Sequence, residues 1–140
     1  MLEWNQNLST GIVEIDEQHK ELFRRINRLL AGVEENRDAD EIRELFLFFD
    51  QYVFRHFGDE ERYIDQLEMR GYGEAAGHRS QHQAFTRDFS AYRADLTGGA
   101  GDALLIAEFR KFMTNWWTLH ILKTDQGLGA FMKRDMPFIT

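Results

Sequence analysis

The residues with the clearest chemical potential in this chain are its five histidines: His19, His56, His78, His82 and His120. Each lies on the apolar stripe by which its segment is expected to face a hydrophobic core. A single histidine in such a place is usually a core residue with a satisfied hydrogen bond. Five together favour one shared site, since neutral imidazole is a common metal ligand.

Local spacing adds carboxylates to this set. His78 and His82 are four residues apart and share one helix face, and the same holds for His56 and Glu60. Glu60 lies on an apolar stripe, where an unpaired carboxylate would be costly to bury. Its neighbours, Asp59 and Glu61, lie off that stripe and are expected to be solvated surface residues.

The pairing of His120 with Asp125 is a weaker signal. Five residues place Asp125 about 140° around an ideal helix from His120. Asp125 can therefore turn inward only if the helix is distorted or ends near Gly127.

These seven donors exceed the six positions of one octahedral metal ion. Two metal ions that share both carboxylates and a bridging oxide or hydroxide would accommodate all seven and leave one position open. Mixed imidazole and carboxylate donors suit iron, with zinc as the main rival. The chain has no Glu-x-x-His on a core stripe, unlike ferritin-like oxidase sites. The histidine-rich set therefore favours reversible dioxygen binding over oxygenation.

Composition excludes several other classes of protein. The absence of cysteine rules out iron–sulfur clusters, zinc–thiolate sites and thiol catalysis. A net charge of −7 argues against a nucleic-acid partner. No apolar run is long enough for membrane insertion, and the first ten residues lack the features of a signal peptide, so a cytoplasmic location is expected.

Hydrophobic periodicity and turn residues predict an all-α fold, an up-down-up-down four-helix bundle with an N-terminal arm. One domain over 1–140 is expected, with an arm at 1–15, the bundle at 16–126 and a C-terminal extension at 127–140. Asp16, Asp40 and Asp102 are the expected N-caps. The expected helices cover about 17–34, 41–68 and 75–96, a segment that starts after Asp102, and a short segment near 128–135.

Four motifs in this order resemble the hemerythrin family, specifically its bacterial members. They are IDEQH ending at His19, HFGDEE from His56, HRSQHQAF from His78, and HILKTD from His120 to Asp125. The resemblance implies two iron ions (Fe2+/Fe3+) with an oxo or hydroxo bridge. It assigns one iron to His78, His82 and His120, the other to His19 and His56, and the bridging role to Glu60 and Asp125. Dioxygen would bind end-on at the iron with two histidines.

One position departs from this resemblance. Bacterial members commonly have Trp-Leu before the last histidine, whereas this chain reads WWTLH and places Trp117 three residues before His120. Trp117 is therefore expected to line the O2 pocket and to make it smaller or more closed. Trp116 is expected to be a core residue.

Several functions remain open at this point. Reversible O2 binding could serve a carrier, a store or a sensing module, and the end of the chain at Thr140 favours a stand-alone protein without an effector domain. NO and azide are further expected ligands. The alternative is an enzyme, a di-iron peroxidase, oxidase or nitric-oxide-handling protein at the same site. A haem-binding bundle would leave three histidines and two carboxylates unexplained.

Overall fold

The computed structural model describes residues 1–35, 37–98 and 101–135. In these ranges the chain is helical and contains no strand. The elements, in chain order, are η1 (Gln6–Leu8), α1 (Val13–Glu34), α2 (Ala39–Glu68), α3 (Ala75–Thr97), α4 (Ala103–His120), the π-helical segment η2 (Ile121–Asp125) and α5 (Gln126–Asp135). Residues 36 and 99–100 in the predicted turns and 136–140 of the predicted C-terminal extension lie outside the described residues.

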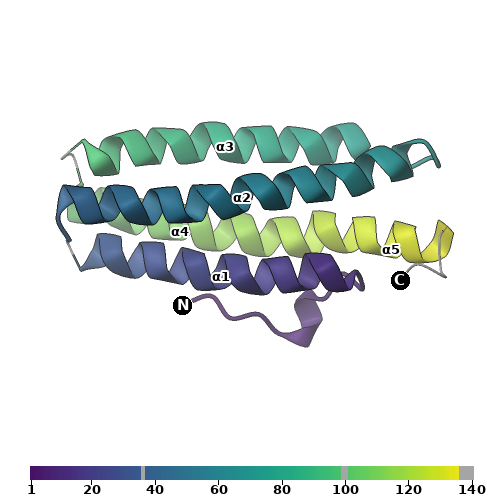
Figure 1. Ribbon diagram of the computed structural model, residues 1–140, viewed down its shortest axis with the longest axis horizontal. Coiled ribbons are helices and arrows are strands. Elements are labelled where there is room, and N and C mark those ends of the chain that lie inside the picture. Colours follow the sequence, from purple (N-terminus) through teal and green to yellow (C-terminus); the bar gives the residue numbers. More distant parts are fainter. Residues whose placement is uncertain (36, 99–100, 136–140) are drawn as a thin grey trace.

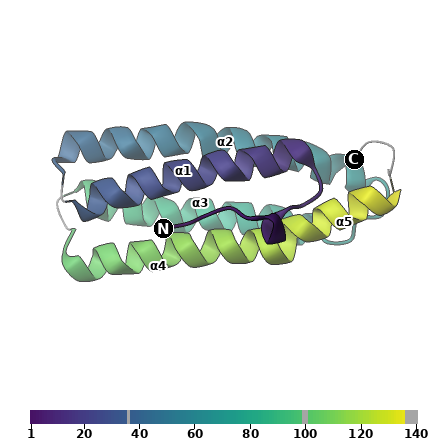
Figure 2. The same ribbon diagram turned by 90° about the horizontal axis from the view of Figure 1, so that it is seen from below.

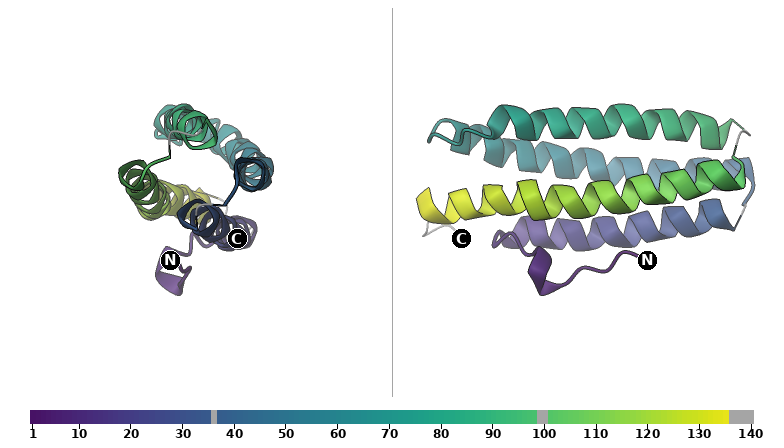
Figure 3. Two further views of the ribbon diagram at one scale, coloured as in Figure 1. Left: turned by 90° about the vertical axis from the view of Figure 1, so that its left-hand side faces the viewer. Right: turned by 180° about the vertical axis from the view of Figure 1, so that it is seen from behind.

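The four long helices pack side by side, and consecutive helices run in opposite directions (Figure 1). An end-on view places them at the corners of a bundle, and α5 continues the line of α4 (Figure 3). The predicted all-α four-helix bundle is confirmed. None of the described helices has an apolar stretch long enough to cross a membrane.

Two predicted N-caps were wrong. Helix α1 begins at Val13, and Asp16 lies in its first turn, where it accepts hydrogen bonds from Ser9 and Thr10. Helix α2 begins at Ala39 because Asp38, and not Asp40, accepts a hydrogen bond from the backbone of Glu41. Asp102 caps α4 as predicted, by accepting from the amide of Leu105 over 2.8 Å.

The apolar stripes meet in two core clusters. The larger one fills the bundle with leucine, isoleucine and phenylalanine side chains from all four long helices. The smaller one joins the start of α1 and the end of α2 to Leu128 and Met132 of α5. A buried polar layer contains the seven candidate ligands, and the surrounding apolar packing keeps water away from it.

The N-terminal arm crosses the bundle close to the junction of α4 and α5 (Figure 2). Gln126 connects the arm to this junction, since its amide nitrogen donates to the carbonyl of Asn7 over 2.6 Å and to that of Ser9 over 3.1 Å. Gly129 lies against the backbone of Thr10, where a side chain would collide with the Thr10 carbonyl. The arm therefore supports the segment that contains Asp125.

Candidate metal centre

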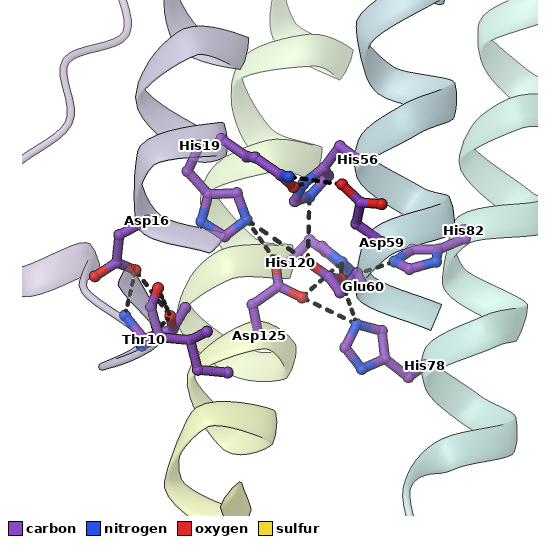
Figure 4. Close-up of polar contacts among 12 residues, drawn as sticks. Thr10, Asp16, His19, His56, Asp59, Glu60, His78, His82, His120 and Asp125 are labelled. Carbon is purple, nitrogen blue, oxygen red and sulfur yellow. Dashed lines mark hydrogen bonds and ion pairs between the residues drawn. The ribbon is translucent and has the colours of Figure 1, made fainter. Parts of the chain in front are cut away.

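All seven predicted ligands meet in one buried cluster (Figure 4). His19 comes from α1, His56 and Glu60 from α2, His78 and His82 from α3, His120 from α4 and Asp125 from η2. None of these residues is more than 3% exposed. A cluster of this depth must satisfy its polar atoms internally or with a bound ion.

One face of the cluster brings three histidines to one oxygen of each carboxylate. His78 Nε2 lies 2.7 Å from Glu60 Oε1 and 2.9 Å from Asp125 Oδ1. His82 Nε2 lies 3.0 Å from Glu60 Oε1. His120 Nε2 lies 3.1 Å from Asp125 Oδ1 and 3.5 Å from Glu60 Oε1. Five donor atoms therefore converge on this face.

The opposite face uses the other oxygen of each carboxylate. His19 Nε2 lies 2.9 Å from Asp125 Oδ2 and 3.8 Å from Glu60 Oε2. His56 Nε2 lies 3.1 Å from Glu60 Oε2. Glu60 and Asp125 thus belong to both groups of potential ligands, and each directs a different oxygen to each group.

Several of these short contacts lack the geometry of hydrogen bonds. The Nε2 atoms of His19, His56 and His120 have no hydrogen-bond partner within the described residues, and neither do Glu60 Oε2 and Asp125 Oδ2. Two buried carboxylates surrounded by imidazoles need positive charge to balance them. The donor set and its unpartnered atoms therefore fit bound metal cations, which would accept the converging lone pairs.

The π-helical segment explains how Asp125 reaches the cluster. The amide of Gln126 donates to the carbonyl of Ile121, five residues earlier, and not to the carbonyl four residues earlier. This wider turn brings residues five apart, such as His120 and Asp125, onto the same face of the helix. The distortion that the spacing required is therefore present, and the helix continues past Gln126 without ending near Gly127.

Two glutamines that the sequence analysis did not identify orient the histidines. Gln18 Oε1 lies 2.7 Å from His56 Nδ1, and Gln81 Oε1 lies 2.7 Å from His120 Nδ1. An acceptor at Nδ1 holds the proton there and leaves the Nε2 lone pair free for a metal. The sequence contained a signal, since each glutamine immediately precedes a predicted ligand, at His19 and at His82. Each glutamine reaches a histidine on the neighbouring helix.

The expectation of a solvated surface residue was wrong for Asp59, whereas Glu61 does reach the surface but also contacts a predicted ligand. The Asp59 side chain is 14% exposed and accepts a hydrogen bond from Gln18 Nε2 over 2.8 Å. Glu61 is half-buried, and its Oε2 lies 2.9 Å from His82 Nδ1. Their positions beside Glu60 place them at the contacts of α2 with α1 and α3, where they hold groups that orient the cluster.

Tyr72 is the partner of the fourth histidine, His78. Its hydroxyl lies 3.3 Å from His78 Nδ1, and burial raises the pKa of Tyr72 to about 12. The neutral hydroxyl can therefore accept from His78 Nδ1 near neutral pH. In the described residues, His19 Nδ1 alone among the five Nδ1 atoms has no partner.

The electrostatics of the cluster are dominated by the two carboxylates. Burial lowers the pKa of His19 and His120, but the negative charges of the nearby Asp125 and Glu60 carboxylates outweigh burial and raise these pKa values to about 9 and about 10. Burial alone would raise the pKa of Glu60 and Asp125, yet the histidines hold both pKa values below their ordinary range. Without metal, imidazole protons therefore balance the carboxylates.

Aromatic side chains cover one side of the cluster. Trp117 is fully buried, and its ring centroid lies 6.1 Å from that of His56 and 5.7 Å from that of Phe57, on which it stacks. Trp116, predicted as a core residue, is only partly buried and stacks on His120 at 4.4 Å. A groove of about 600 Å³ between α2 and α3 is lined in part by Phe57 and His82.

Comparison with known proteins agrees with this geometry. A sequence profile described as the hemerythrin HHE cation binding domain matches residues 10–131. The chain is 32% identical to a bacteriohemerythrin of Pseudomonas paraeruginosa, over 96% of this chain and 84% of that protein. It is 28% identical to a bacteriohemerythrin of Methylococcus capsulatus, over 86% and 87% of the two chains. For a bacteriohemerythrin of Clostridium acetobutylicum the identity is 26%, over 90% and 97%.

Proposed function

Because this chain belongs to the hemerythrin family, we propose that it holds two iron ions in the buried cluster and binds dioxygen reversibly at one of them. One observation carries the proposal. The two oxygens of Glu60 and of Asp125 are divided between the three-histidine face and the two-histidine face. Two carboxylates oriented in this way suit a pair of metal ions that share them as bridges.

The protein residues then have separate roles. His78, His82 and His120 hold one iron, His19 and His56 hold the other, and Glu60 and Asp125 bridge the two. When bound, the two irons would supply the electrons that pass reversibly to dioxygen. Gln18, Gln81, Glu61 and Tyr72 keep the Nδ1 protons of four of the histidines in place.

The ligand count favours the two-histidine iron as the place for dioxygen. The two-histidine face offers four protein donors, whereas the three-histidine face offers five. With one further shared oxide or hydroxide, the iron held by His78, His82 and His120 would have six ligands, and the iron held by His19 and His56 would have five and one open position. Trp117 and Phe57 pack beside His56, and their apolar rings would exclude water from that position. The groove between α2 and α3 is lined in part by Phe57 and His82, which makes it the candidate route for a small ligand.

The donor set also favours a binding protein over an enzyme. Five neutral imidazoles and two carboxylates carry little negative charge, so the set does not favour the high iron oxidation states that oxygenation requires. A carrier, a store and a sensing module all need the same reversible site.

The test is metal analysis combined with absorption spectra of the reduced protein before and after exposure to air. We expect two irons per chain, near-ultraviolet and visible charge-transfer bands on exposure, and their reversal when oxygen is removed. One metal per chain, or zinc in protein isolated without added metal, would contradict the proposal. Sustained peroxide turnover with a reducing substrate would instead support the enzymatic alternative.

A further inference from the structure

Trp117 contains a buried polar group with no acceptor. Its side chain is fully buried, and its indole Nε1 has no hydrogen-bond partner in the part of the chain that the structure describes. Trp4 Nε1 is also unpartnered, but the Trp4 side chain is only partly buried. An unsatisfied buried N–H is costly and uncommon in folded proteins, so the one on Trp117 needs a physical explanation.

Most of the aromatic rings around Trp117 are apolar. The neighbouring rings on its apolar side are those of Phe49, Phe57, Phe85 and Trp116. The polar rings beside it are His56 at 6.1 Å and His120 at 6.5 Å between centroids. Both histidines direct Nε2 to the carboxylates and donate Nδ1 to a glutamine, so neither offers an acceptor atom to the indole.

We propose that the indole N–H of Trp117 donates a hydrogen bond to the small ligand bound at the iron of His19 and His56. This inference rests on the proposed function, since it needs an open metal position beside His56. A dioxygen-derived or azide ligand on iron carries negative charge, and a hydrogen bond to a charged acceptor is stronger than one between neutral groups. The donor would be fixed in place before the ligand arrives, because the fully buried indole is stacked on Phe57 and meets the rings of Phe49 and Phe85 edge-on.

An aromatic alternative competes with this assignment. The ring of Phe49 meets Trp117 edge-on at 6.3 Å and 88°, and that of Phe85 does so at 5.3 Å and 71°. In either pair the indole N–H could point at a phenyl face, a weak interaction that would not depend on a metal ligand. Ligand binding would change the hydrogen bonding of the indole N–H in the first case but not in the second.

The experiment uses iron-loaded diferric protein and azide as the probe. Ultraviolet resonance Raman spectra contain an indole band that reports the strength of the N–H hydrogen bond. We expect azide to shift this band in the unmodified protein and in Trp116→Phe, but not in Trp117→Phe. Azide should also bind about tenfold more weakly to Trp117→Phe, as expected for loss of a hydrogen bond to a charged ligand. Trp116→Phe should retain most of the affinity.

Each outcome separates the two proposals. If azide binds and its charge-transfer band forms while the indole band of the unmodified protein stays unchanged, the inference about Trp117 is wrong and the proposed function stands. If no iron-dependent azide band forms in the unmodified protein or in any variant, the proposed function is wrong, and the inference that rests on it is wrong as well. The spectra of the unmodified protein decide the matter even if Trp117→Phe does not fold. Tighter azide binding by folded Trp117→Phe would show that the side chain only obstructs the site, and would overturn the inference.

Discussion

Gln18 on α1 links His56 and Asp59 on α2, since its carbonyl oxygen lies 2.7 Å from His56 Nδ1 and its amide nitrogen donates to Asp59 Oδ2 over 2.8 Å. The amide orientation is determined by this arrangement, because the Asp59 carboxylate can only accept. On the other side of the bundle, Gln81 has the same relation to His120 and accepts a second hydrogen bond from Thr124 over 2.9 Å. Each glutamine therefore orients one histidine ligand of the proposed iron pair for metal binding, Gln18 for His56 and Gln81 for His120.

The first prediction concerns Gln18→Met, which keeps the length of the side chain and removes the acceptor. We expect the affinity for the iron held by His19 and His56 to fall about 10- to 100-fold, because His56 loses the group that fixes its proton at Nδ1. Gln51→Met is the matched control, since Gln51 lies on the exposed side of the same helix as His56. Metal titration followed by absorption would measure both, and equal affinities in the two variants would refute the role of Gln18.

A second prediction compares Glu60→Gln with Glu61→Gln. The amide of Glu60→Gln has only one oxygen, so one of the two faces loses its ligand and a buried N–H₂ faces the imidazoles. Iron content should fall from about two to about one per chain or less. Glu61→Gln keeps an oxygen that can accept from His82 Nδ1, so its iron content should stay close to that of the unmodified protein. Elemental analysis of the purified variants measures the difference, and similar iron loss in both would contradict the bridging assignment.

A third prediction is that the metal stabilises the fold. Removal of the metal should lower Tm by about 10 °C, because a site saturated 1,000-fold above its Kd contributes about 4 kcal/mol and each kcal/mol shifts Tm by about 2–4 °C. Calorimetry of matched samples with and without metal gives this value. Hydrogen exchange should accelerate most in Ile121–Asp125, where the backbone holds a π turn that brings Asp125 to the metal. Equal melting curves would show that the cluster is stable without an ion.

The fourth prediction concerns pH and applies to the metal-free protein. The pKa values of His19 and His120, about 9 and about 10, lie above the value near 6.5 of an unfolded chain. Their contribution to stability is therefore complete below pH 6.5 and is lost as pH rises through 9 and 10. In the iron-loaded protein these nitrogens bind metal, so the loss should be absent. The difference in Tm between the two forms should widen from pH 7 to pH 10, and a constant difference would argue against protonated histidines in the metal-free cluster.

The fifth prediction tests Trp117 as a cover over the open position. In Trp117→Ala, azide should enter and leave the diferric form faster, and the oxygenated form should autoxidise faster, because water and anions reach the site. Trp116→Ala is the control, since Trp116 stacks on His120 but is partly exposed. Removal of a buried tryptophan side chain typically costs about 3–5 kcal/mol, so both variants should be measured at a temperature where each stays folded. Equal rates in the two variants would contradict a gating role for Trp117.

The fold class and the seven candidate ligands were predictable from the sequence alone. Helical periodicity placed His19, His56, Glu60, His78 and His82 on inward stripes, and four-residue spacing requires such pairs to share a face. Helix starts were less predictable, because Asp38 and the predicted Asp40 are both good caps by residue type. Only the hydrogen bond from the backbone amide of Glu41 to Asp38 distinguishes them.

Tertiary structure decided how the predicted ligands face one another and what surrounds them. The inward turn of Asp125 depends on a π-helical segment, whereas residue spacing left open either a distorted helix or a helix end near Gly127. The division of the Glu60 oxygens between two groups of histidines depends on how α1, α3 and α4 are placed relative to α2. Gln18 and Asp59 lie off the apolar stripes, so their roles arise only where neighbouring helices meet. Periodicity describes one helix at a time, whereas these contacts are set by packing between helices.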